Sequence, residues 1–373
     1  MKAIIVGGGI MGLSVAWALA RNGHAVELFE QGPLPNPLAS SMDEHRLIRH
    51  PYGDQVGYAR LIDDAYAAWD LLWGDLGQRL YAATGTLALT GNGADWAERS
   101  AAALAAIGKP MTELPVADLR NRFPQIEAHG VERAFWMESG GVLFAQDIVV
   151  ALARYLTGQP HVRLYPHTPV RSVDLEQGRV VTATGAVHAA DVVVVAAGAW
   201  INRLLPGFGQ RLVPSRQTVI YFDLPADARA AWAQGPMIIE KTGDVGLYLV
   251  PPMEGRGLKV GDHEFSRSGD PMDERTASED DIRPLLARCR SLLRGFDQWR
   301  TDRLKICFYT VTDDERFVVE KPAANGWIMS PCSGHGFKFG ALMGLELART
   351  LVSGRDAAAH ARWAAGLEVP VWK

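Results

Sequence analysis

A glycine-rich segment near the start of the chain, residues 7–12 with the sequence GGGIMG, has the spacing GxGxxG. In this pattern the first glycine permits a tight turn, the second lets the backbone approach a pyrophosphate, and the third allows a helix to pack closely on a strand. The pyrophosphate then lies at the N-terminus of that helix, where backbone amides are free to bind an anion. Glu30 follows at a distance suited to a ribose 2′-hydroxyl.

The glycine fingerprint and the acid together predict a dinucleotide site, and they do not by themselves separate FAD from NAD. The alternative is a glycine turn that binds nothing, followed by a glutamate that faces solvent. The cofactor contacts predicted at this point are Gly7, Gly9, Ile10, Met11, Gly12 and Glu30.

Three further segments, residues 40–53, 257–263 and 333–339, combine glycine with charged side chains in a way that a structural core does not require. A planar guanidinium binds a carboxylate through two parallel hydrogen bonds, and a fixed cation stabilises negative charge that develops on oxygen. A lone arginine or lysine is more often a solvated surface charge. The three segments are therefore informative as a set.

Together with the fingerprint, they resemble the monomeric sarcosine oxidase and N-methyltryptophan oxidase group of the D-amino-acid-oxidase (DAO) superfamily of FAD-dependent oxidoreductases. The resemblance runs from the N-terminal GGGIMG to the C-terminal SGHGFKF, and it is dense only in the motifs. It implies a Rossmann-like FAD-binding domain and a second, substrate domain built on a mostly antiparallel sheet, within an α/β (α+β) fold.

The segment SSMDEHRLIRHPYG, residues 40–53, resembles the family loop SSHGDTRIIRHAYG. The match places Arg46 beside the flavin and Arg49 at the substrate carboxylate, with Ser40 and Ser41 at the cofactor. Residues 42–45 read Met-Asp-Glu-His where the family has His-Gly-Asp-Thr, so the flavin-side environment is expected to differ.

The heptapeptide SGHGFKF, residues 333–339, matches the family without a change. By resemblance, Lys338 is the second cation on the substrate carboxylate, and the glycines let backbone amides reach the flavin pyrimidine ring. The further cofactor contacts implied by the resemblance are Val170, Ala197, Gly198, Trp200, Gly334, His335, Gly336, Phe337 and Lys338.

The segment GLKVGDH, residues 257–263, resembles the family GLKLGYH, whose lysine lies over the flavin and activates oxygen. The matching residue is Lys259, and a fixed cation there stabilises the superoxide that forms when dioxygen takes up one electron. An exposed strand lysine is the alternative. Tyr248 matches an active-site tyrosine of the family. His263 matches an active-site histidine, with a partnered core histidine as the alternative.

The segment CFYT, residues 307–310, resembles the family CMYT, in which the cysteine is bonded through sulfur to the flavin 8α position. The resemblance thus implies FAD attached through Cys307, with a raised reduction potential, and Tyr309 in the substrate pocket. Without the motif, a free cysteine is most often an inert core residue. Cys289 and Cys332 match no role and are expected to be structural.

The elements that position these motifs follow from the apolar pattern. Residues 2–6, 10–21 and 25–29 predict a strand, a helix and a strand, and residues 191–197 (DVVVVAA) predict a second buried strand of the same parallel sheet. The other predicted strands are 85–90, 218–222, 237–239 and 246–250, and the other predicted helices are 94–106, 116–123, 279–293 and 340–351.

The order of these elements predicts two discontinuous domains. The FAD-binding domain is expected to comprise residues 1–84, 145–215 and 315–373, and the substrate domain residues 85–144 and 216–314. The pieces are interleaved, since the chain shows no repeat and no low-complexity linker.

Composition narrows the class of protein. Among 373 residues, 38 basic and 42 acidic side chains give a net charge of −4 with no long block of like charge, which excludes a nucleic-acid partner. Three scattered cysteines suit a reducing cytoplasm, and no metal-ligand cluster is evident. Residues 4–20 imitate a secretory signal, but three glycines favour a strand, turn and helix. No other stretch approaches a membrane span.

The function implied by the resemblance is FAD-dependent oxidation of the C–N bond of a small carboxylated amine or amino acid to an imine, with O2 reoxidising the flavin and giving H2O2. One alternative is a dehydrogenase that passes electrons to a quinone or a protein acceptor. A second is a flavin-binding protein without turnover. Sarcosine, N-methyl amino acids, proline or pipecolate, and larger N-alkyl amino acids are all open as substrates, and a monomer is expected from the resemblance alone.

Overall fold

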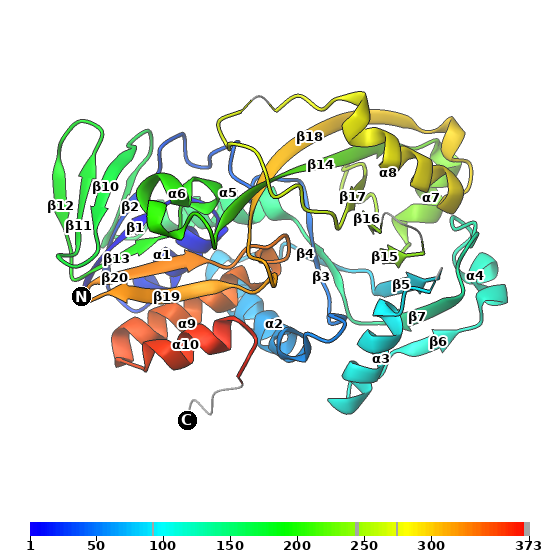
Figure 1. The fold of residues 1–373 in the computed structure, drawn as a ribbon, viewed down its shortest axis with the longest axis horizontal. Helices are drawn as coiled ribbons and strands as arrows, with labels where there is room; N and C mark the ends of the chain where they lie inside the picture. Colours follow the sequence, from blue (N-terminus) through cyan, green and yellow to red (C-terminus); the bar gives the residue numbers. More distant parts are fainter. Residues whose placement is uncertain (92, 243–245, 274, 369–373) are drawn as a thin grey trace.

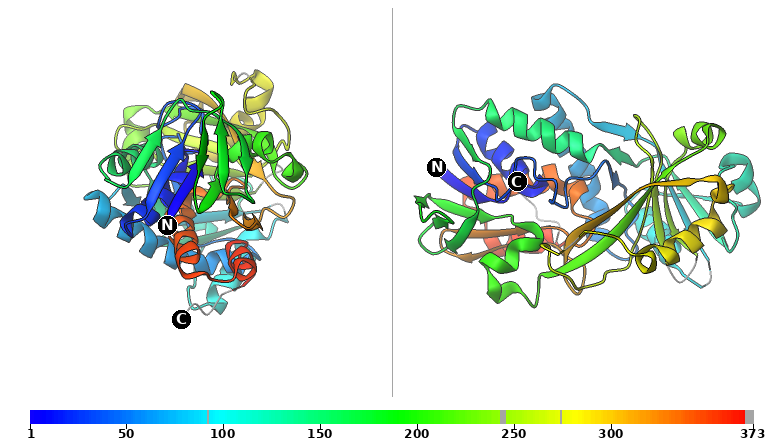
Figure 2. Two further views of the ribbon diagram at one scale, coloured as in Figure 1. Left: turned by 90° about the vertical axis from the view of Figure 1, so that its left-hand side faces the viewer. Right: turned by 90° about the horizontal axis from the view of Figure 1, so that it is seen from above.

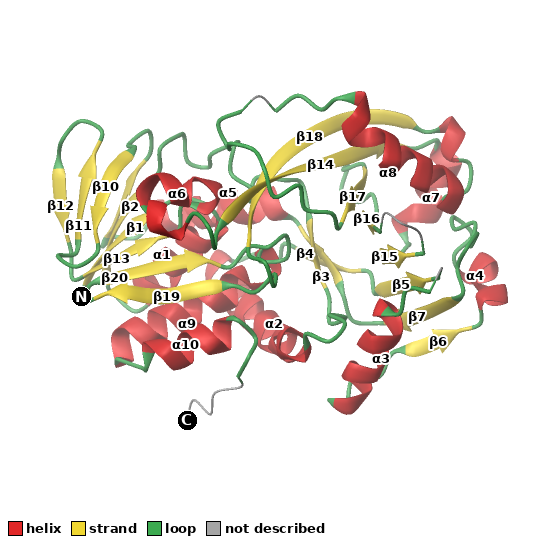
Figure 3. Ribbon diagram, viewed as in Figure 1, coloured by secondary structure: helices red, strands yellow, loops and turns green. Residues whose placement is uncertain are grey.

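The computed structural model describes residues 1–91, 93–242, 246–273 and 275–368. Figure 1 shows two large sheets side by side in an elongated molecule, with the first strand and the last helix of the chain both on the left-hand side. Figure 3 shows helices gathered below the first sheet and over the outer side of the second.

The first sheet contains the predicted strand-helix-strand unit. Its central strands pair in parallel, and the apolar run near residue 193 pairs with the first strand, which confirms that the two distant segments share one sheet. Short β-branched runs that are buried on both faces form such sheets. The strand order is β19 (Val318–Ala323), β20 (Gly326–Ser330), β13 (Val192–Val195), β1 (Lys2–Val6), β2 (Ala25–Phe29) and β9 (Val162–Tyr165).

Alternate side chains of β1 enter two different cores, as the period of two in a strand requires. Ala3 and Ile5 pack among helices on one face, whereas Ile4 and Val6 pack against a small sheet on the other. The helices are α1 (Ile10–Arg21), α2 (Val56–Leu76), α5 (Ala145–Thr157), α9 (Gly340–Ser353) and α10 (Ala357–Ala364). The small sheet comprises β10 (Val170–Asp174), β11 (Arg179–Thr182) and β12 (Val187–Ala189), with helix α6 (Ile201–Leu204) beside it.

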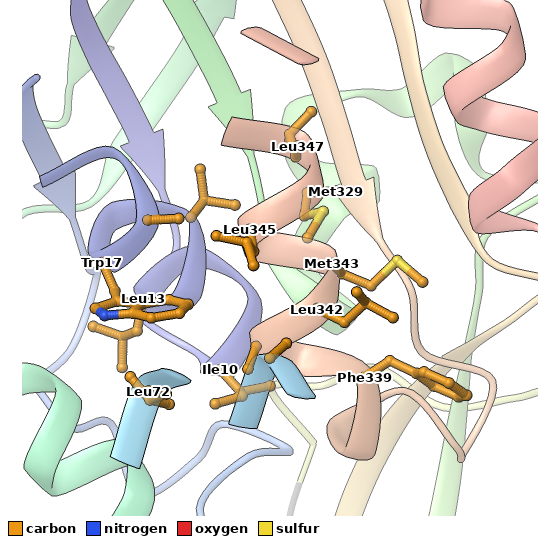
Figure 4. Close-up of a cluster of buried hydrophobic side chains, with 14 of the residues drawn as sticks. Ile10, Leu13, Trp17, Leu72, Met329, Phe339, Leu342, Met343, Leu345 and Leu347 are labelled. Atoms are coloured by element: carbon orange, nitrogen blue, oxygen red, sulfur yellow. The ribbon is translucent and has the colours of Figure 1, made fainter. Parts of the chain in front are cut away.

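Helices α1 and α9 lie against each other over their length, and Figure 4 shows their apolar side chains meeting around Leu13 and Leu345. The contact is close because of Gly344, where a Cβ would lie 2.5 Å from the backbone carbon of Ser14. The packing of α9 on α1 therefore joins the C-terminal part of the chain to the helix that opens with the glycine fingerprint.

The second sheet is mostly antiparallel, as predicted, and its one parallel pair among the described residues joins β5 to β15. Its strand order is β18 (Arg300–Val311), β14 (Val213–Asp223), β17 (Leu258–Asp262), β16 (Leu247–Val250), β15 (Met237–Lys241), β5 (Thr86–Thr90), β7 (Arg133–Met137) and β6 (Thr112–Leu114). The two sheets confirm the predicted fold class.

One face of the second sheet is covered by α4 (Val116–Arg122), α7 (Ala226–Ala233) and α8 (Glu279–Leu292), which share a core with its strands. Helix α8 begins at a capping box in which Ser278 and Asp281 satisfy each other's backbone amides. The helix α3 (Trp96–Ala106) packs against β5 and β7. Cys289 lies in the α8 core, in keeping with a structural role.

The long strands β14 and β18 pair along their whole length and run between the two halves of the molecule, as the right-hand view of Figure 2 shows. A second junction is a three-stranded sheet of β3 (Arg46–Ile48), β8 (Gly141–Leu143) and β4 (Tyr81–Ala83). Short 3₁₀ turns lie at η1 (Gly198–Trp200), η2 (Pro206–Phe208), η3 (Phe296–Gln298) and η4 (Phe337–Phe339). The junction strands thus bring predicted site residues from both halves together.

The predicted elements differ from the structure mainly at their ends. The strand expected at 218–222 extends over all of β14, because β18 supplies a pairing partner for the whole of it. The strand expected at 191–197 ends two residues early, because the chain turns there into the site. The helices α2 and α5 and the strand β18 were not predicted. The division into two discontinuous domains stays a prediction.

Candidate active site

The first of two cavities lies at the carboxyl ends of β1 and β13 and has a volume of about 330 Å³. Gly7 adopts a φ of +113°, and a Cβ there would lie 2.3 Å from the carbonyl oxygen of Ala196, so only glycine fits. A Cβ on Gly12 would lie 1.9 Å from the carbonyl oxygen of Gly7. At Gly9, by contrast, only Ser41 Oγ lies within 4 Å of such a Cβ, so this backbone is open to a ligand.

The start of α1 is tied to the predicted flavin loop. The backbone amide of Ile10 donates to Ser41 Oγ at 2.9 Å. The hydroxyl of Ser40 donates to the carbonyl of Phe308, and its own carbonyl accepts from Arg46 Nη2 at 2.7 Å. The two serines therefore hold this loop between the fingerprint helix and β18.

Glu30 is buried, so the solvent-facing alternative for it is wrong. One carboxylate oxygen accepts from the backbone amide of Gly8 at 2.8 Å, and the other accepts from the amide of Gly32 at 3.0 Å and from Asn36 Nδ2 at 2.9 Å. These bonds orient the carboxylate at the cavity wall, and the oxygen that accepts from Gly8 keeps a lone pair for a ribose hydroxyl.

Most predicted cofactor residues line this first cavity. They are Gly7, Gly9, Ile10, Met11, Glu30, Ser40, Ser41, Arg46, Val170, Ala197, Gly198, Trp200, Gly334, Gly336 and Phe337. An elongated cavity with free glycine backbone at one end and glycine loops at the other fits a dinucleotide. FAD is thus compatible with the residues present.

Four predicted cofactor residues lie elsewhere. Gly12 packs beneath the turn, and His335 and Lys338 line the second cavity. Cys307 is buried on β18 on the same side of the strand as Tyr309, close enough to Arg46 to affect its pKa, but it is not part of the described wall of either cavity. Cys332, which was expected to be structural, does line the first cavity.

The second cavity has a volume of about 440 Å³ and adjoins the first, since both include Arg46, Tyr309, Gly334 and Phe337 in their walls. It brings together all seven predicted catalytic residues. They are Arg46, Arg49, Tyr248, Lys259, His263, Tyr309 and Lys338.

Arg49 is 9% exposed and lies over two aromatic rings, with its guanidinium carbon 4.8 Å from the centre of the Tyr52 ring and 5.2 Å from that of Trp96. Its Nη1 atom has no hydrogen-bond partner, and among the described residues no carboxylate forms an ion pair with it. Burial lowers the pKa of this guanidinium. The aromatic rings fix the plane of the side chain, so its free edge faces the cavity.

Lys338 supplies a second buried cation beside Arg49. Its ammonium donates to the Tyr52 hydroxyl at 3.0 Å, and its backbone carbonyl accepts from Trp69 Nε1 at 2.7 Å. Burial, and then the charge of Arg49, hold the pKa of Lys338 well below its usual range. Two buried cations without an anion are costly, and a bound carboxylate removes that cost.

Lys259 is 1% exposed, so the exposed-strand alternative for it is wrong. Its ammonium donates to Asp43 Oδ2 at 2.5 Å and to the carbonyl of His45 at 3.3 Å. Burial, followed by the charge of Arg46, holds the pKa of Lys259 well below its usual range, and the Glu44 carboxylate acts in the opposite direction.

His263, Tyr248 and Tyr309 form an uncharged wall of the second cavity. Burial raises the pKa of both tyrosines. Burial, followed by the charges of Lys241, Arg49 and others, holds the pKa of His263 well below its usual range, so the imidazole is neutral. The ring is hydrogen-bonded to the backbone of Leu247, and its Nε2 atom has no hydrogen-bond partner among the described residues.

Several residues of the second cavity were not predicted to belong to the site. Tyr52 follows Arg49 by three residues inside the matched loop, so its position was a usable signal. Trp96 and Lys241 lie in separate segments without a motif, and nothing in their spacing pointed to the site. Asp43 was noticed only as a departure from the family loop.

The described residues contain no group of three or more side chains suited to hold a metal ion. Among the same residues, no helix is both long and apolar enough to cross a membrane.

The sequence is similar to those of known flavin enzymes along most of its length. The family model "DAO: FAD dependent oxidoreductase" matches residues 2–350. Monomeric sarcosine oxidase of Bacillus sp. (strain NS-129) is 28% identical over 366 residues, covering 94% of this chain and 93% of that protein. N-methyl-L-tryptophan oxidase of Yersinia pestis (strain Pestoides F) is 26% identical over 348 residues, covering 91% and 92%.

Solved structures show the same fold at lower identity. L-proline dehydrogenase from P. horikoshii superposes with a TM-score of 0.83 at 19% identity, covering 98% of this chain and 96% of the other. Glycine oxidase from Geobacillus kaustophilus superposes with a TM-score of 0.79 at 22% identity, covering 96% of each. The family match spans nearly the whole chain, and the resemblance inferred from the motifs is confirmed. The chain belongs to the DAO family of FAD-dependent oxidoreductases and is similar to its sarcosine and N-methyltryptophan oxidases.

Proposed function

We propose that this protein oxidises the C–N bond of a small secondary amine or amino acid that carries a carboxylate, giving an imine, and that dioxygen is the final electron acceptor and becomes hydrogen peroxide. The observation that carries the proposal is the pair of buried cations, Arg49 and Lys338, which face a cavity beside the FAD cavity without a carboxylate partner among the described residues. The names of the sequence relatives support the same substrate class.

FAD, when bound, supplies the acceptor for a hydride equivalent from the carbon next to nitrogen. In this proposal, the backbone at Gly9 and the N-terminus of α1 hold the pyrophosphate, and Glu30 holds the ribose. The loop at residues 333–337 borders both cavities and would hold the flavin ring between them. Attachment through Cys307 is part of the proposal.

Arg49 and Lys338 orient the substrate in this proposal. The free edge of Arg49 offers two parallel N–H donors to the carboxylate, and Lys338 offers a third charge-assisted donor from the side. The rings of Tyr52 and Trp96 hold the guanidinium in one plane, so the α-carbon is presented in one direction.

His263 holds the substrate amine in its neutral form in this proposal. A substrate amine has to be neutral before it can lose a hydride equivalent, and the unpartnered Nε2 atom of the neutral imidazole can accept a hydrogen bond from the amine N–H. Tyr248 and Tyr309 stay uncharged beside it, because burial raises the pKa of both. The imine that is formed is hydrolysed by water.

The second candidate is a dehydrogenase that passes electrons to a quinone or protein acceptor. It is favoured by one observation, the pairing of Lys259 with Asp43, because a paired lysine offers less positive charge to dioxygen.

The test is to supply the purified protein, in air, with sarcosine, N-methyl amino acids, proline, pipecolate and matching amines that lack a carboxylate. Bleaching of the flavin with peroxide from a carboxylated amine supports the proposal. Bleaching that needs a quinone dye for turnover supports the dehydrogenase. A flavin that no amine bleaches contradicts both.

A further inference from the structure

Asp43 places a carboxylate at the centre of a cluster of donors behind the second cavity. The side chain is 2% exposed. Lys259 Nζ lies 2.5 Å from Oδ2, Lys305 Nζ lies 3.7 Å from Oδ1, and Arg46 forms an ion pair with the same carboxylate. The hydroxyl of Tyr221 donates to Oδ1.

Burial of a carboxylate is unfavourable unless it is paired and hydrogen-bonded, and Asp43 has three cations and a phenol around it. It is therefore ionised. Lys259 in turn depends on the segment at residues 43–45. Its side chain is almost fully buried, and it donates one hydrogen bond to the Asp43 carboxylate and one to the carbonyl of His45. Asp43 thus fixes the position and the direction of the Lys259 ammonium.

Two of the three cations around Asp43 also line the candidate active site. Lys259 and Arg46 line the second cavity, and Arg46 also lines the FAD cavity. With Lys305 they carry three positive charges, of which one is cancelled by Asp43. At a separation of 2.5 Å the carboxylate opposes most of the field of the lysine at any point a few ångströms beyond it.

We propose that Asp43 is a positioning residue that reduces the positive charge presented to the flavin by Lys259 and Arg46, and thereby slows the reaction with dioxygen. The inference rests on the proposed function and names the residue that controls its electron acceptor. In the affected step, dioxygen takes up two electrons and two protons from reduced FAD and becomes hydrogen peroxide, and the first electron transfer creates negative charge that a free lysine stabilises. A neutral two-electron acceptor such as a quinone has a weaker need for that charge.

The test compares Asp43→Asn, which keeps the shape and removes the charge, with Glu44→Gln. The matched control removes the neighbouring carboxylate, which pairs with Arg303 instead. In each holoenzyme the flavin is reduced by light, so no substrate is required. The readouts are the midpoint potential of the bound flavin, the affinity for sulfite, and the rates of reoxidation by dioxygen and by a quinone dye.

In Asp43→Asn, the ratio of reduced to oxidised flavin at a fixed potential is expected to rise at least tenfold, which corresponds to about 30 mV for a two-electron couple. Sulfite is expected to bind at least tenfold more tightly, and reoxidation by dioxygen to accelerate at least tenfold, while the quinone rate changes less than threefold. Glu44→Gln is expected to shift each of the four values by less than threefold, because Glu44 acts on Lys259 through its charge but forms its ion pair with Arg303. An unchanged or lowered potential in Asp43→Asn, or an equal shift in Glu44→Gln, overturns the inference.

Loss of the carboxylate also leaves buried cations unpaired, so the folding of Asp43→Asn is tested by urea unfolding of the holoenzyme. If the single variant does not fold, the double variant Asp43→Asn/Lys259→Met removes both members of the pair. Recovery of cooperative unfolding in the double variant supports the coupling of Asp43 to Lys259, and a double variant no more stable than the single one contradicts it. Failure of the proposed function is separate, because it shows only in the reactions with amines.

Discussion

Arg49 illustrates at the scale of a single residue how an unpaired group indicates a ligand. Its guanidinium lies between two aromatic rings, with one nitrogen that no described residue satisfies. A structural arginine of this burial is expected to have a carboxylate partner. The missing anion is therefore supplied by the substrate in our proposal.

Arg49→Met is expected to lower kcat/KM for a carboxylated amine by a factor on the order of 10² to 10³, mostly through KM, because one partner of a buried charge pair is lost. An amine without a carboxylate should lose far less. Steady-state kinetics with both substrate types gives the comparison, and Arg60→Met, which changes an exposed arginine of α2, is the control. Equal losses for the two substrate types mean that Arg49 does not bind the carboxylate.

Asp262 is a second residue whose environment has a measurable consequence. Burial raises the pKa of its carboxyl from 3.8 to about 6. The folded protein therefore binds a proton that the unfolded chain releases between these values, so the contribution of Asp262 to stability is present below about pH 4 and is lost as pH rises through about 6.

Asp262→Asn imitates the protonated carboxyl at every pH. The difference in unfolding free energy between this variant and the parent is expected to move in favour of the variant by about 2 to 3 kcal/mol between pH 4 and pH 7. Urea unfolding of the two holoenzymes at both pH values measures it. A difference that does not depend on pH would show that Asp262 titrates normally.

At the scale of elements, the contact between α1 and α9 decides whether the fingerprint helix is held in place. Gly344→Ala is expected to destabilise the protein by about 1 to 3 kcal/mol, because the new Cβ would lie 2.5 Å from the backbone of Ser14. The matched control is Gly74→Ala, at an exposed position of α2 with nothing within 4 Å, where stability should rise by about 0.5 to 1 kcal/mol. Urea unfolding of the two variants checks both signs, and a neutral Gly344→Ala would mean that the helices separate easily.

The elements also show where sequence was informative. The strand at 2–6, the helix at 10–21 and the strand at 25–29 have the predicted bounds, because apolar runs and glycine punctuation act locally there. Strand β18 was not predicted, since its first half is charged and partly exposed, and its pairing with β14 depends on residues about 90 positions away. Long-range pairing of this kind leaves little local pattern.

The candidate site likewise contains residues that the sequence could identify and residues that it could not. The fingerprint, the heptapeptide at 333–339 and the cations at 46, 49 and 259 were available as motifs, and the structure brings them to two adjoining cavities. Asp43 and Trp96 were not available in this way, because their importance depends on what lies opposite them in the fold. Their roles, like those of the predicted catalytic residues, stay proposals that the variants above test.

At the scale of the whole molecule, the cavity that fits FAD lies between segments that are distant in the chain, so cofactor binding is expected to stabilise the fold as a unit. The first cavity has walls from the N-terminal fingerprint, the turn near residue 198 and the loop at 334–337. A ligand that binds only the folded state contributes about 2.7 kcal/mol at a free concentration one hundred times its dissociation constant.

The proposed covalent attachment through Cys307 would change that dependence, because a tethered cofactor cannot be diluted away. We therefore expect the Tm of the parent holoenzyme to be independent of added FAD and its yellow colour to stay with the acid-precipitated protein. In Cys307→Ser the colour should move to the supernatant and the Tm should rise with free FAD. Cys332→Ser separates the two thiols, since Cys332 lines the FAD cavity and Cys307 lies behind it on β18. If the precipitated protein loses its colour only in Cys332→Ser, the flavin is attached to Cys332 and not to Cys307. If the precipitated parent protein has no colour, the cofactor is held by the cavity without a covalent bond.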